Sequence, residues 1–230
     1  MSAVTEATGG RRELRKAQTR AEIRSVAQRL FAERGFDGVT IADVAAAADV
    51  AVQTVFNHFP TKEDLFFDGR TPWVEGTAES VAQRAGGQDP TAALRAYLQA
   101  DLTALLEQET RPENRSYLEA LAQSPSLQAR ERSLVEQAWQ LVAGELLAAT
   151  TADGTPLSPV TTQFLSELTG ALFMVAGRVL VLEHRRLVLA EPADEAEQAE
   201  VRRHTEATLG ALEECLRTLA GRLADGAAEA

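Results

Sequence analysis

The chain has 230 residues, of which 45% are hydrophobic and 25% are charged, the balance of an ordinary soluble globular protein. No apolar run reaches the roughly 18 residues of a membrane span, residues 1–10 lack the apolar segment of a secretory signal, and the single cysteine, Cys215, excludes an internal disulfide framework and a multi-cysteine zinc site. We therefore expect a cytoplasmic protein without a metal or other cofactor, in which residues 1–10 are a disordered lead-in.

The net charge of −11 is distributed unevenly along the chain. Residues 1–62 carry a net +2 and residues 63–230 a net −13, and the segment Arg11–Arg24 alone carries +4. A basic N-terminal part on an acidic remainder suits DNA binding, because attraction to phosphates is local and is screened within about 10 Å. A solvated charged helix face would show the same charges, so charge alone leaves both interpretations open.

Apolar residues recur at helical spacing in nearly every segment, and the period-2 alternation of a strand is absent. The sequence therefore predicts an all-α protein with a small N-terminal domain over residues 11–67 and a larger helical bundle over residues 68–230. Clusters of Gly, Pro and Asp mark the ends of the expected helices, which cover residues 11–34, 41–48, 52–59, 62–84, 91–109, 113–123, 127–150, 159–186 and 194–224.

The first two helices carry clear local signals. Ile23, Ala27, Leu30 and Phe31 form an amphipathic stripe that favours burial. Thr40 and Asp43 have the spacing of a capping box at the start of a helix of two turns. The helix ends at Asp49, a residue that tolerates left-handed backbone, so we expect a sharp turn there.

The third helix has one apolar and one polar face. Val52, Val55, Phe56 and Phe59 are spaced as a buried face, and the opposite side carries four hydrogen-bonding side chains: Gln53, Thr54, Asn57 and His58. Amides have the paired donor and acceptor that reads an adenine edge. Thr and His suit contacts to phosphates or thymine methyl groups. Lys62, just beyond this helix, is expected to be free to meet a phosphate.

The stretch RAEIRSVAQRLFAERGFDGVTIADVAAAADVAVQTVFNHFPTKEDLF resembles the DNA-binding domain of the tetracycline-repressor (TetR) family over about a fifth of the chain. The resemblance implies a three-helix helix-turn-helix domain whose third helix enters the major groove. It assigns DNA contacts to Thr40, Thr54, Phe56, Asn57, His58 and Lys62, and a minor-groove arm to Arg11, Arg12, Arg15 and Lys16.

Three positions depart from the family pattern. Asp49 stands where a glycine is usual, Phe56 replaces a common tyrosine and loses its hydroxyl contact, and Gln53 occupies a position that is often small or proline. Gln53 therefore adds a further candidate for base contact. These differences bear on which operator sequence is read.

The C-terminal bundle is predicted from three long apolar stripes. They are Leu134, Ala138, Leu141, Glu145 and Leu146 in one helix, Leu165, Leu168, Leu172, Val175, Val179 and Leu182 in the next, and Val201, Thr205, Leu209, Leu212, Leu216, Leu219 and Leu223 in the last. The resemblance implies that the last two helices pair with their twins in a homodimer. An intramolecular bundle would show the same pattern.

The family resemblance also implies a small-molecule pocket in the C-terminal domain. Candidate ligand-binding residues are Trp73, Tyr97, Tyr117, Trp139, Phe164, Phe173, Met174 and Arg178. Simple core packing explains each aromatic residue equally well. Arg178 needs a partner such as Glu167 or Glu183 if it is buried.

Three classes of function were compared. The sequence has no recognisable catalytic or phosphate-binding motif, and its three histidines lie far apart, so no catalytic residue is expected. A helical interaction protein would leave the polar face of residues 53–58 unused. We therefore expect a dimeric, sequence-specific transcriptional regulator of a palindromic operator, acting as a ligand-responsive repressor, with an activator of the same family as the alternative.

Overall fold

The computed structural model describes residues 3–190 and 195–228, and the side chains of all of these except residues 3–11, 72, 195 and 226–228. The described residues form eleven α-helices and one short 3-10 helix, without a strand among them, which confirms the all-α prediction. They divide into two compact units, which are described separately. The head unit comprises residues 1–70 and 119–130, and the body unit comprises residues 71–118 and 131–230.

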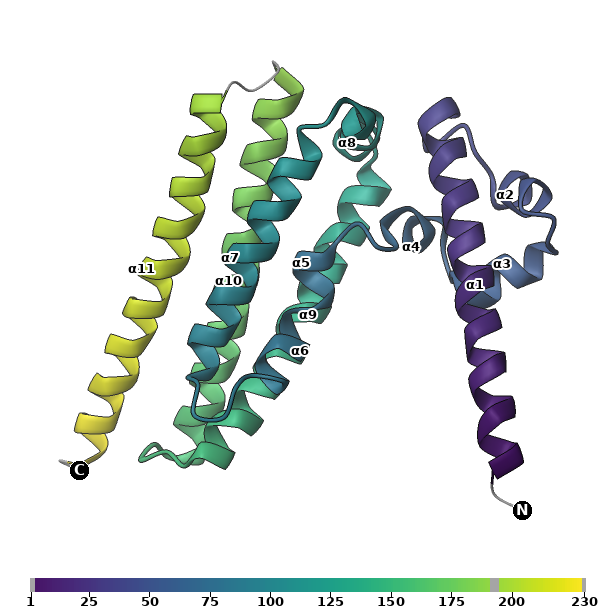
Figure 1. Ribbon diagram of the computed structural model, residues 1–230. Helices are drawn as coiled ribbons and strands as arrows, with labels where there is room; N and C mark the ends of the chain where they lie inside the picture. The colour runs from purple at the N-terminus through teal and green to yellow at the C-terminus, as the bar shows by residue number, and fades with distance from the viewer. Residues whose placement is uncertain (1–2, 191–194, 229–230) are drawn as a thin grey trace. The chain divides into compact units, whose positions relative to one another are not determined.

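Four helices build the N-terminal part of the head unit (Figure 1): α1 (Ala3–Arg34), α2 (Ile41–Ala47), α3 (Val52–His58) and α4 (Lys62–Phe67). Helix α1 contacts both α2 and α4, and α2 contacts α3. The predicted stripe of α1 is buried, since Ile23 and Ala27 have no exposed surface. The rings of Phe31, Phe36 and Phe66 pack against one another around this stripe, with centroids 5.3–5.8 Å apart.

Local hydrogen bonds fix where the short helices begin and end. At the start of α2 the Thr40 amide donates to Asp43 Oδ2 over 2.8 Å, and the Asp43 amide donates to Thr40 Oγ1 over 3.1 Å, so the predicted capping box is confirmed. Thr61 and Asp64 form a second capping box at α4. Asp49 has φ of 53°, as expected for the sharp turn between α2 and α3.

The single helix predicted over residues 62–84 is wrong, because this segment forms α4, α5 (Pro72–Glu75) and α6 (Thr77–Ala82). Gly69 has a left-handed φ of 68°, and a proline inside a helix removes one of its hydrogen bonds, so the chain breaks before Pro72. It breaks again at Gly76, where a Cβ would lie 2.0 Å from the Tyr97 hydroxyl oxygen. These breaks depend on contacts that helical periodicity does not register.

Two predicted boundaries also change. Helix α1 begins at Ala3, so residues 3–10 continue the helix instead of forming a disordered lead-in, and no proline interrupts them. Residues 119–130 belong to the head unit, not to the C-terminal domain, because Arg130 forms a 2.6 Å ion pair with Asp64 of α4. Asp68 also belongs to the head unit, where it pairs with Arg20 and Arg24 of α1.

The remaining helices are α7 (Pro90–Glu109), the 3-10 helix η1 (Pro112–Asn114), α8 (Arg115–Gln123), α9 (Pro125–Asp153), α10 (Pro159–Ala190) and α11 (Glu195–Ala228). In the body unit α7, α10 and α11 lie side by side and contact one another (Figure 1). Their core is built around the fully buried Trp73, Leu98, Phe173 and Leu209, with residues of α9 such as Val142 completing it. Leu209 lies on the predicted stripe of α11, which is confirmed as a buried face over most of its length.

Two predicted stripes of the body are partly wrong. Leu141 of α9 is 65% exposed, because the buried face of this helix instead runs through Val135, Ala138 and Val142. In α10 the side chains of Val175 and Val179 are more than half exposed. Helix α10 has apolar residues on two sides, and the chain itself covers only one of them.

Helix α10 is also the described helix that is long and apolar enough to cross a membrane, contrary to the expectation from the sequence. Its most apolar window of 18 residues has a mean hydropathy of 1.6, and 44% of that window is buried within the protein. The core helix of a soluble protein satisfies the same criterion. Arg185 and His184, both almost fully buried, lie in the same helix.

Candidate nucleic-acid interface

Helix α3 rests on the head core through Val55 and Phe59, whose side chains have no exposed surface. On its outer side Gln53 and Asn57 are exposed, and Gln53 Nε2 donates to Asn57 Oδ1 over 3.1 Å. This bond leaves the Gln53 carbonyl oxygen and the Asn57 amide protons available to a partner. The two amides therefore present a donor and an acceptor from adjacent turns of one short helix.

The predicted buried face of α3 is narrower than expected. Val52 is 42% exposed and Phe56 is 43% exposed, because a helix of seven residues meets its neighbours along a single edge. Phe56 was expected to be core on periodicity and a DNA contact on resemblance, and its exposure fits the second role. Thr54 and His58 are half-buried at the margins of the same face.

Arg20 of α1 fixes the end of α3, a role that the sequence analysis missed. Its Nη1 donates to the His58 carbonyl oxygen over 2.6 Å, and its guanidinium lies 4.3 Å from the centroid of the Phe59 ring. Its Nη2 atom donates to the carboxylate of Asp68. A cation at a helix C-terminus is favourable, so Arg20 positions α3 from the core side. The partners lie 38 to 48 residues away in the chain, and no local pattern connects them.

The surroundings of His58 disfavour its charged form. Burial, and then the charges of Arg20 and Lys16, lower its pKa from the ordinary value of histidine. Its Nδ1 atom is buried and forms no hydrogen bond with the described residues. Because Nδ1 is buried, at most the Nε2 atom can reach a nucleic acid, and a neutral imidazole adds no positive charge.

Lys62 is not free, contrary to the prediction. Its ammonium donates to the carbonyl oxygens of Phe36 and Val39 over 2.9 and 3.1 Å and lies 4.0 Å from the centroid of the Phe36 ring. The ammonium thus links the start of α4 to the loop before α2, because a cation forms strong hydrogen bonds with backbone carbonyl oxygens. One of its three protons remains for any further contact.

The basic segment before the core lies on the N-terminal half of α1. Arg12, Arg15 and Lys16 are exposed there, and the side chain of Arg11 lies outside the described ones. The backbone of this segment is helical, in agreement with the helix predicted over residues 11–34. Its charges therefore lie along a helix surface that begins next to the head core.

The eight predicted ligand-binding residues do not converge on one cavity. Trp73, Phe173 and Met174 are fully buried in the body core, Tyr117 is also buried, and Phe164 is 52% exposed. The four buried side chains fill space instead of bordering it, so the packing alternative accounts for these four.

The other predicted residues have separate surroundings. Tyr97 is half-buried beside Gly76, where burial, and then the Asp101 carboxylate, raise the pKa of its hydroxyl. Trp139 borders a surface hollow of about 360 Å³. A larger cavity, of about 450 Å³, is lined by none of the eight.

The buried arginine of α10 is Arg185, not Arg178. Arg185 Nε lies 2.8 and 3.1 Å from the carboxylate oxygens of Glu109, and its Nη1 lies 2.5 Å from Glu131 Oε1. All three side chains are almost completely buried. Arg178 is half-buried and forms neither of the pairs proposed for it, since Glu183 pairs with Arg186 and Glu167 accepts from Gln163.

Two short helices, joined by a tight left-handed turn, with the second presenting polar side chains to solvent, define a helix-turn-helix protein of the DNA-binding class. Residues 23–68 match the family described as bacterial regulatory proteins, tetR family. The match covers the helix-turn-helix segment, from the middle of α1 to the end of α4.

Three similar proteins illustrate the relationship. The transcriptional regulator MftR of Mycobacterium tuberculosis, named for mycofactocin biosynthesis, is 30% identical over 58% of this chain and 66% of its own length. The transcriptional repressor KstR2 of Rhodococcus jostii is 38% identical over 22% of this chain and 24% of its own length. The matches thus span less than two thirds of these relatives.

Among solved structures, NalD of Pseudomonas aeruginosa is similar over 84% of this chain and 95% of its own, at 21% identity and a TM-score of 0.47. It is described as the secondary repressor of the MexAB-OprM multidrug efflux pump.

Proposed function

We propose that this protein is a sequence-specific transcriptional regulator that reads operator DNA with α3. The proposal rests on one observation: α3 exposes polar side chains on its outer face and is packed against the head core through Val55 and Phe59. Gln53 and Asn57 make the base contacts, and Thr54, Phe56 and His58 at the margins contact phosphates or thymine methyl groups. Thr40 caps α2, and on DNA binding its hydroxyl proton exchanges Asp43 Oδ2, which accepts it over 2.6 Å in the free protein, for a phosphate oxygen. The exposed arginines of α1 add contacts to the DNA backbone.

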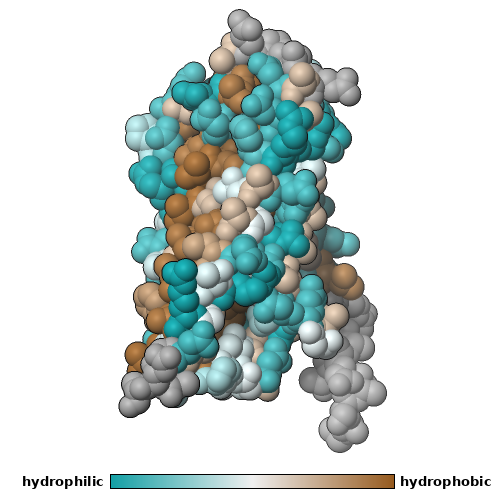
Figure 2. Space-filling view, turned by 90° about the vertical axis from the view of Figure 1, so that its left-hand side faces the viewer, coloured by the Kyte–Doolittle hydropathy of each residue, from teal (hydrophilic) through white to brown (hydrophobic). Residues whose placement is uncertain are grey.

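The regulator acts as a homodimer, and the outer side of α10 supports this. Its exposed apolar residues form a stripe at helical spacing, composed of Val160, Phe164, Leu172, Val175, Val179 and Leu182. Figure 2 shows a band of apolar surface on the side of the body that carries α10 and α11. A contiguous apolar stripe of this length marks an interface, and two identical subunits match the two halves of a palindrome.

Charge substitutions in this stripe test the dimer. Val175→Glu and Val179→Glu should each give a monomer in sedimentation velocity, and both should weaken operator binding. Leu141→Glu is the matched control, because Leu141 is a 65% exposed apolar residue of α9 outside the stripe. Monomeric wild-type protein at micromolar concentration would refute the dimer.

The sign of regulation is repression in this proposal, and the protein works in the cytoplasm, where its DNA target is. KstR2 is described as a repressor, which supports this choice. A ligand that binds one arrangement of the two heads better than the other shifts the dimer away from its operator. A reporter gene behind the operator distinguishes repression from activation, since deletion of the regulator raises expression only in the first case.

The first test is selection of bound sequences from a random duplex pool by the purified full-length protein. An enriched palindrome is the expected result. No enrichment at low salt, where phosphate attraction is strongest, would refute sequence reading by α3.

A further inference from the structure

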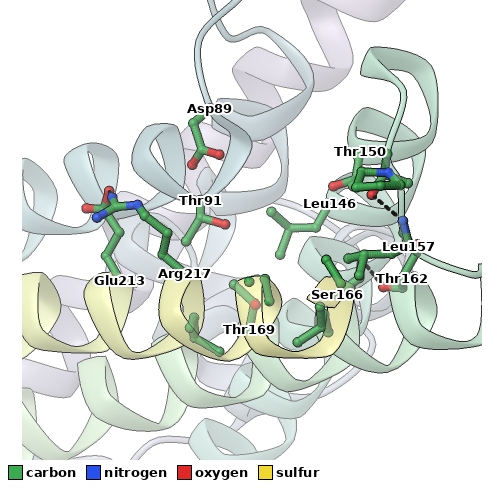
Figure 3. Close-up of a pocket in the computed structure, with 17 residues that line it drawn as sticks. Asp89, Thr91, Leu146, Thr150, Leu157, Thr162, Ser166, Thr169, Glu213 and Arg217 are labelled. Carbon is green, nitrogen blue, oxygen red and sulfur yellow. Dashed lines mark hydrogen bonds and ion pairs between the residues drawn. The ribbon is translucent and has the colours of Figure 1, made fainter. Parts of the chain in front are cut away.

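The body unit contains a cavity of about 450 Å³ that no predicted ligand residue lines. It lies between the first turn of α7, the last turns of α9, the first half of α10 and the second half of α11, beside the loop 155–157. Figure 3 shows Thr91 and Leu146 on one side of the space and Ser166 and Thr169 on the other. Cavities of about 300–1,000 Å³ hold small organic molecules.

The wall formed by α10 carries three hydroxyl groups at positions i, i+4 and i+7. Thr162 Oγ1 and Ser166 Oγ donate to helix carbonyls over 3.0 and 2.9 Å, so each presents oxygen lone pairs to the cavity. Thr169 is only 6% exposed and lines the same wall. A hydroxyl oxygen accepts hydrogen bonds, so a ligand with an O–H or N–H group would find acceptors along this wall.

The rest of the lining is mainly aliphatic. Leu165 and Leu216 close the inner side, and Leu146, Leu157 and Ala220 border the remaining space. A saturated carbon skeleton fits these surfaces, since burial of apolar area is favourable at roughly 25 cal/mol per Å².

The charged groups at the edge of the cavity already have partners within the protein. Arg217 Nη2 lies 2.5 Å from Glu213 Oε1, and Arg95 pairs with the other oxygen of Glu213. The Asp89 carboxylate accepts the Ala92 amide proton over 2.8 Å as the N-cap of α7. A charged ligand would therefore have to compete with these partners for a countercharge, which is unfavourable in a mainly apolar cavity.

We propose that this cavity binds an uncharged, largely aliphatic molecule that carries a hydroxyl or N–H donor, and that the donor is held by the hydroxyl row of α10. The molecule is the effector of the regulator, and this last step rests on the function proposed above. The cavity itself requires no DNA.

Three ten-carbon probes separate the ligand classes, because they share one chain and differ only in the charge of the head group. Titration calorimetry of the full-length protein without DNA compares 1-decanol, decanoate and decylammonium below their micelle concentrations. The expected result is that 1-decanol binds at least tenfold more tightly than either ion. Equal or tighter binding of decanoate or decylammonium overturns the uncharged class.

Two glycines of α11 provide matched variants for the location. A Cβ at Gly221, which lines the cavity, or at Gly210, which does not, would meet no atom within 4 Å. Both positions are helical, where leucine is more favourable than glycine. Gly221→Leu should weaken 1-decanol binding at least tenfold and Gly210→Leu less than twofold. Unchanged affinity in Gly221→Leu overturns the site.

Thr169→Val tests the hydroxyl row, because it keeps the shape of the side chain and removes the oxygen. It should weaken 1-decanol about fivefold and leave the thermal midpoint of the unliganded protein unchanged or higher. Equal affinity for 1-decanol overturns the role of Thr169.

Operator release by 1-decanol is measured separately. If calorimetry gives the expected pattern and the selected operator is not released, the cavity inference stands and its regulatory role is refuted.

Discussion

Replacement of Lys62 by methionine separates a structural lysine from a phosphate contact. Met keeps the apolar stem and removes the ammonium that donates to the carbonyls of Phe36 and Val39. Hydrogen bonds to a charged group contribute about 1.5–3 kcal/mol each when buried. Lys62 is half-buried, so water replaces part of each bond, and we expect a loss of about 2 kcal/mol in local stability, or roughly 30-fold in the opening equilibrium at about 1.4 kcal/mol per tenfold.

Amide hydrogen exchange of α2 measures this opening directly, because exchange rates report local unfolding. The α2 amides of Lys62→Met should exchange about 30-fold faster at ~2 kcal/mol lower local stability, and the salt dependence of operator affinity should not change. Lys16→Met is the matched control, since Lys16 is exposed on α1, and it should leave α2 exchange unaltered. Unchanged exchange in Lys62→Met, together with a salt slope lower by about one, would show that Lys62 contacts a phosphate instead.

Three further predictions follow from the same geometry. Gln53→Ala and Asn57→Ala should each lower discrimination between operator variants by about 1–3 kcal/mol, measured by competition binding, and unaltered base preference in both variants contradicts the assigned readout. Arg185→Met strands two buried carboxylates and should destabilise the protein by about 3–5 kcal/mol, seen as a lower thermal midpoint, whereas Arg186→Met, at an exposed pair, should change it by less than about 1 kcal/mol. Burial, and then the charge of Arg185, lower the pKa of His184 from 6.5 to about 4. The unfolded chain therefore gains a proton before the folded chain does, and His184 lowers the stability as the pH falls from 6.5 towards 4. His184→Leu should weaken the pH dependence of the thermal midpoint in that window, and a pH profile identical to that of the wild type contradicts this.

Periodicity and capping signals predicted the head closely. Ile23, Val55 and Phe59 are buried where the spacing placed them, and Thr40 begins α2 through the predicted capping box. These features are local: each depends on residues within one or two turns of helix, and the sequence states them directly. The exposed amides of Gln53 and Asn57 follow from the same argument, since they lie opposite the buried edge.

The spacing did not distinguish the two apolar sides of α10. Leu165 is buried and Val175 is exposed, although both lie at helical spacing in one apolar helix. An apolar stripe shows that a surface is to be covered, but not whether the same chain or another copy covers it. The glycine at position 76 is of the same kind, because the Tyr97 hydroxyl from α7 leaves no room for a Cβ there.

The sequence by itself determined the helical class, the helix-turn-helix and its polar outer face, because helix periodicity, caps and turns are set by neighbours in the chain. Only the tertiary structure decided which charged groups pair within each unit. Arg20 reaches Asp68 across 48 residues, and Arg185 reaches Glu109 across 76. A charged side chain has many opposite charges within the sequence, and packing alone brings one of them within hydrogen-bond distance.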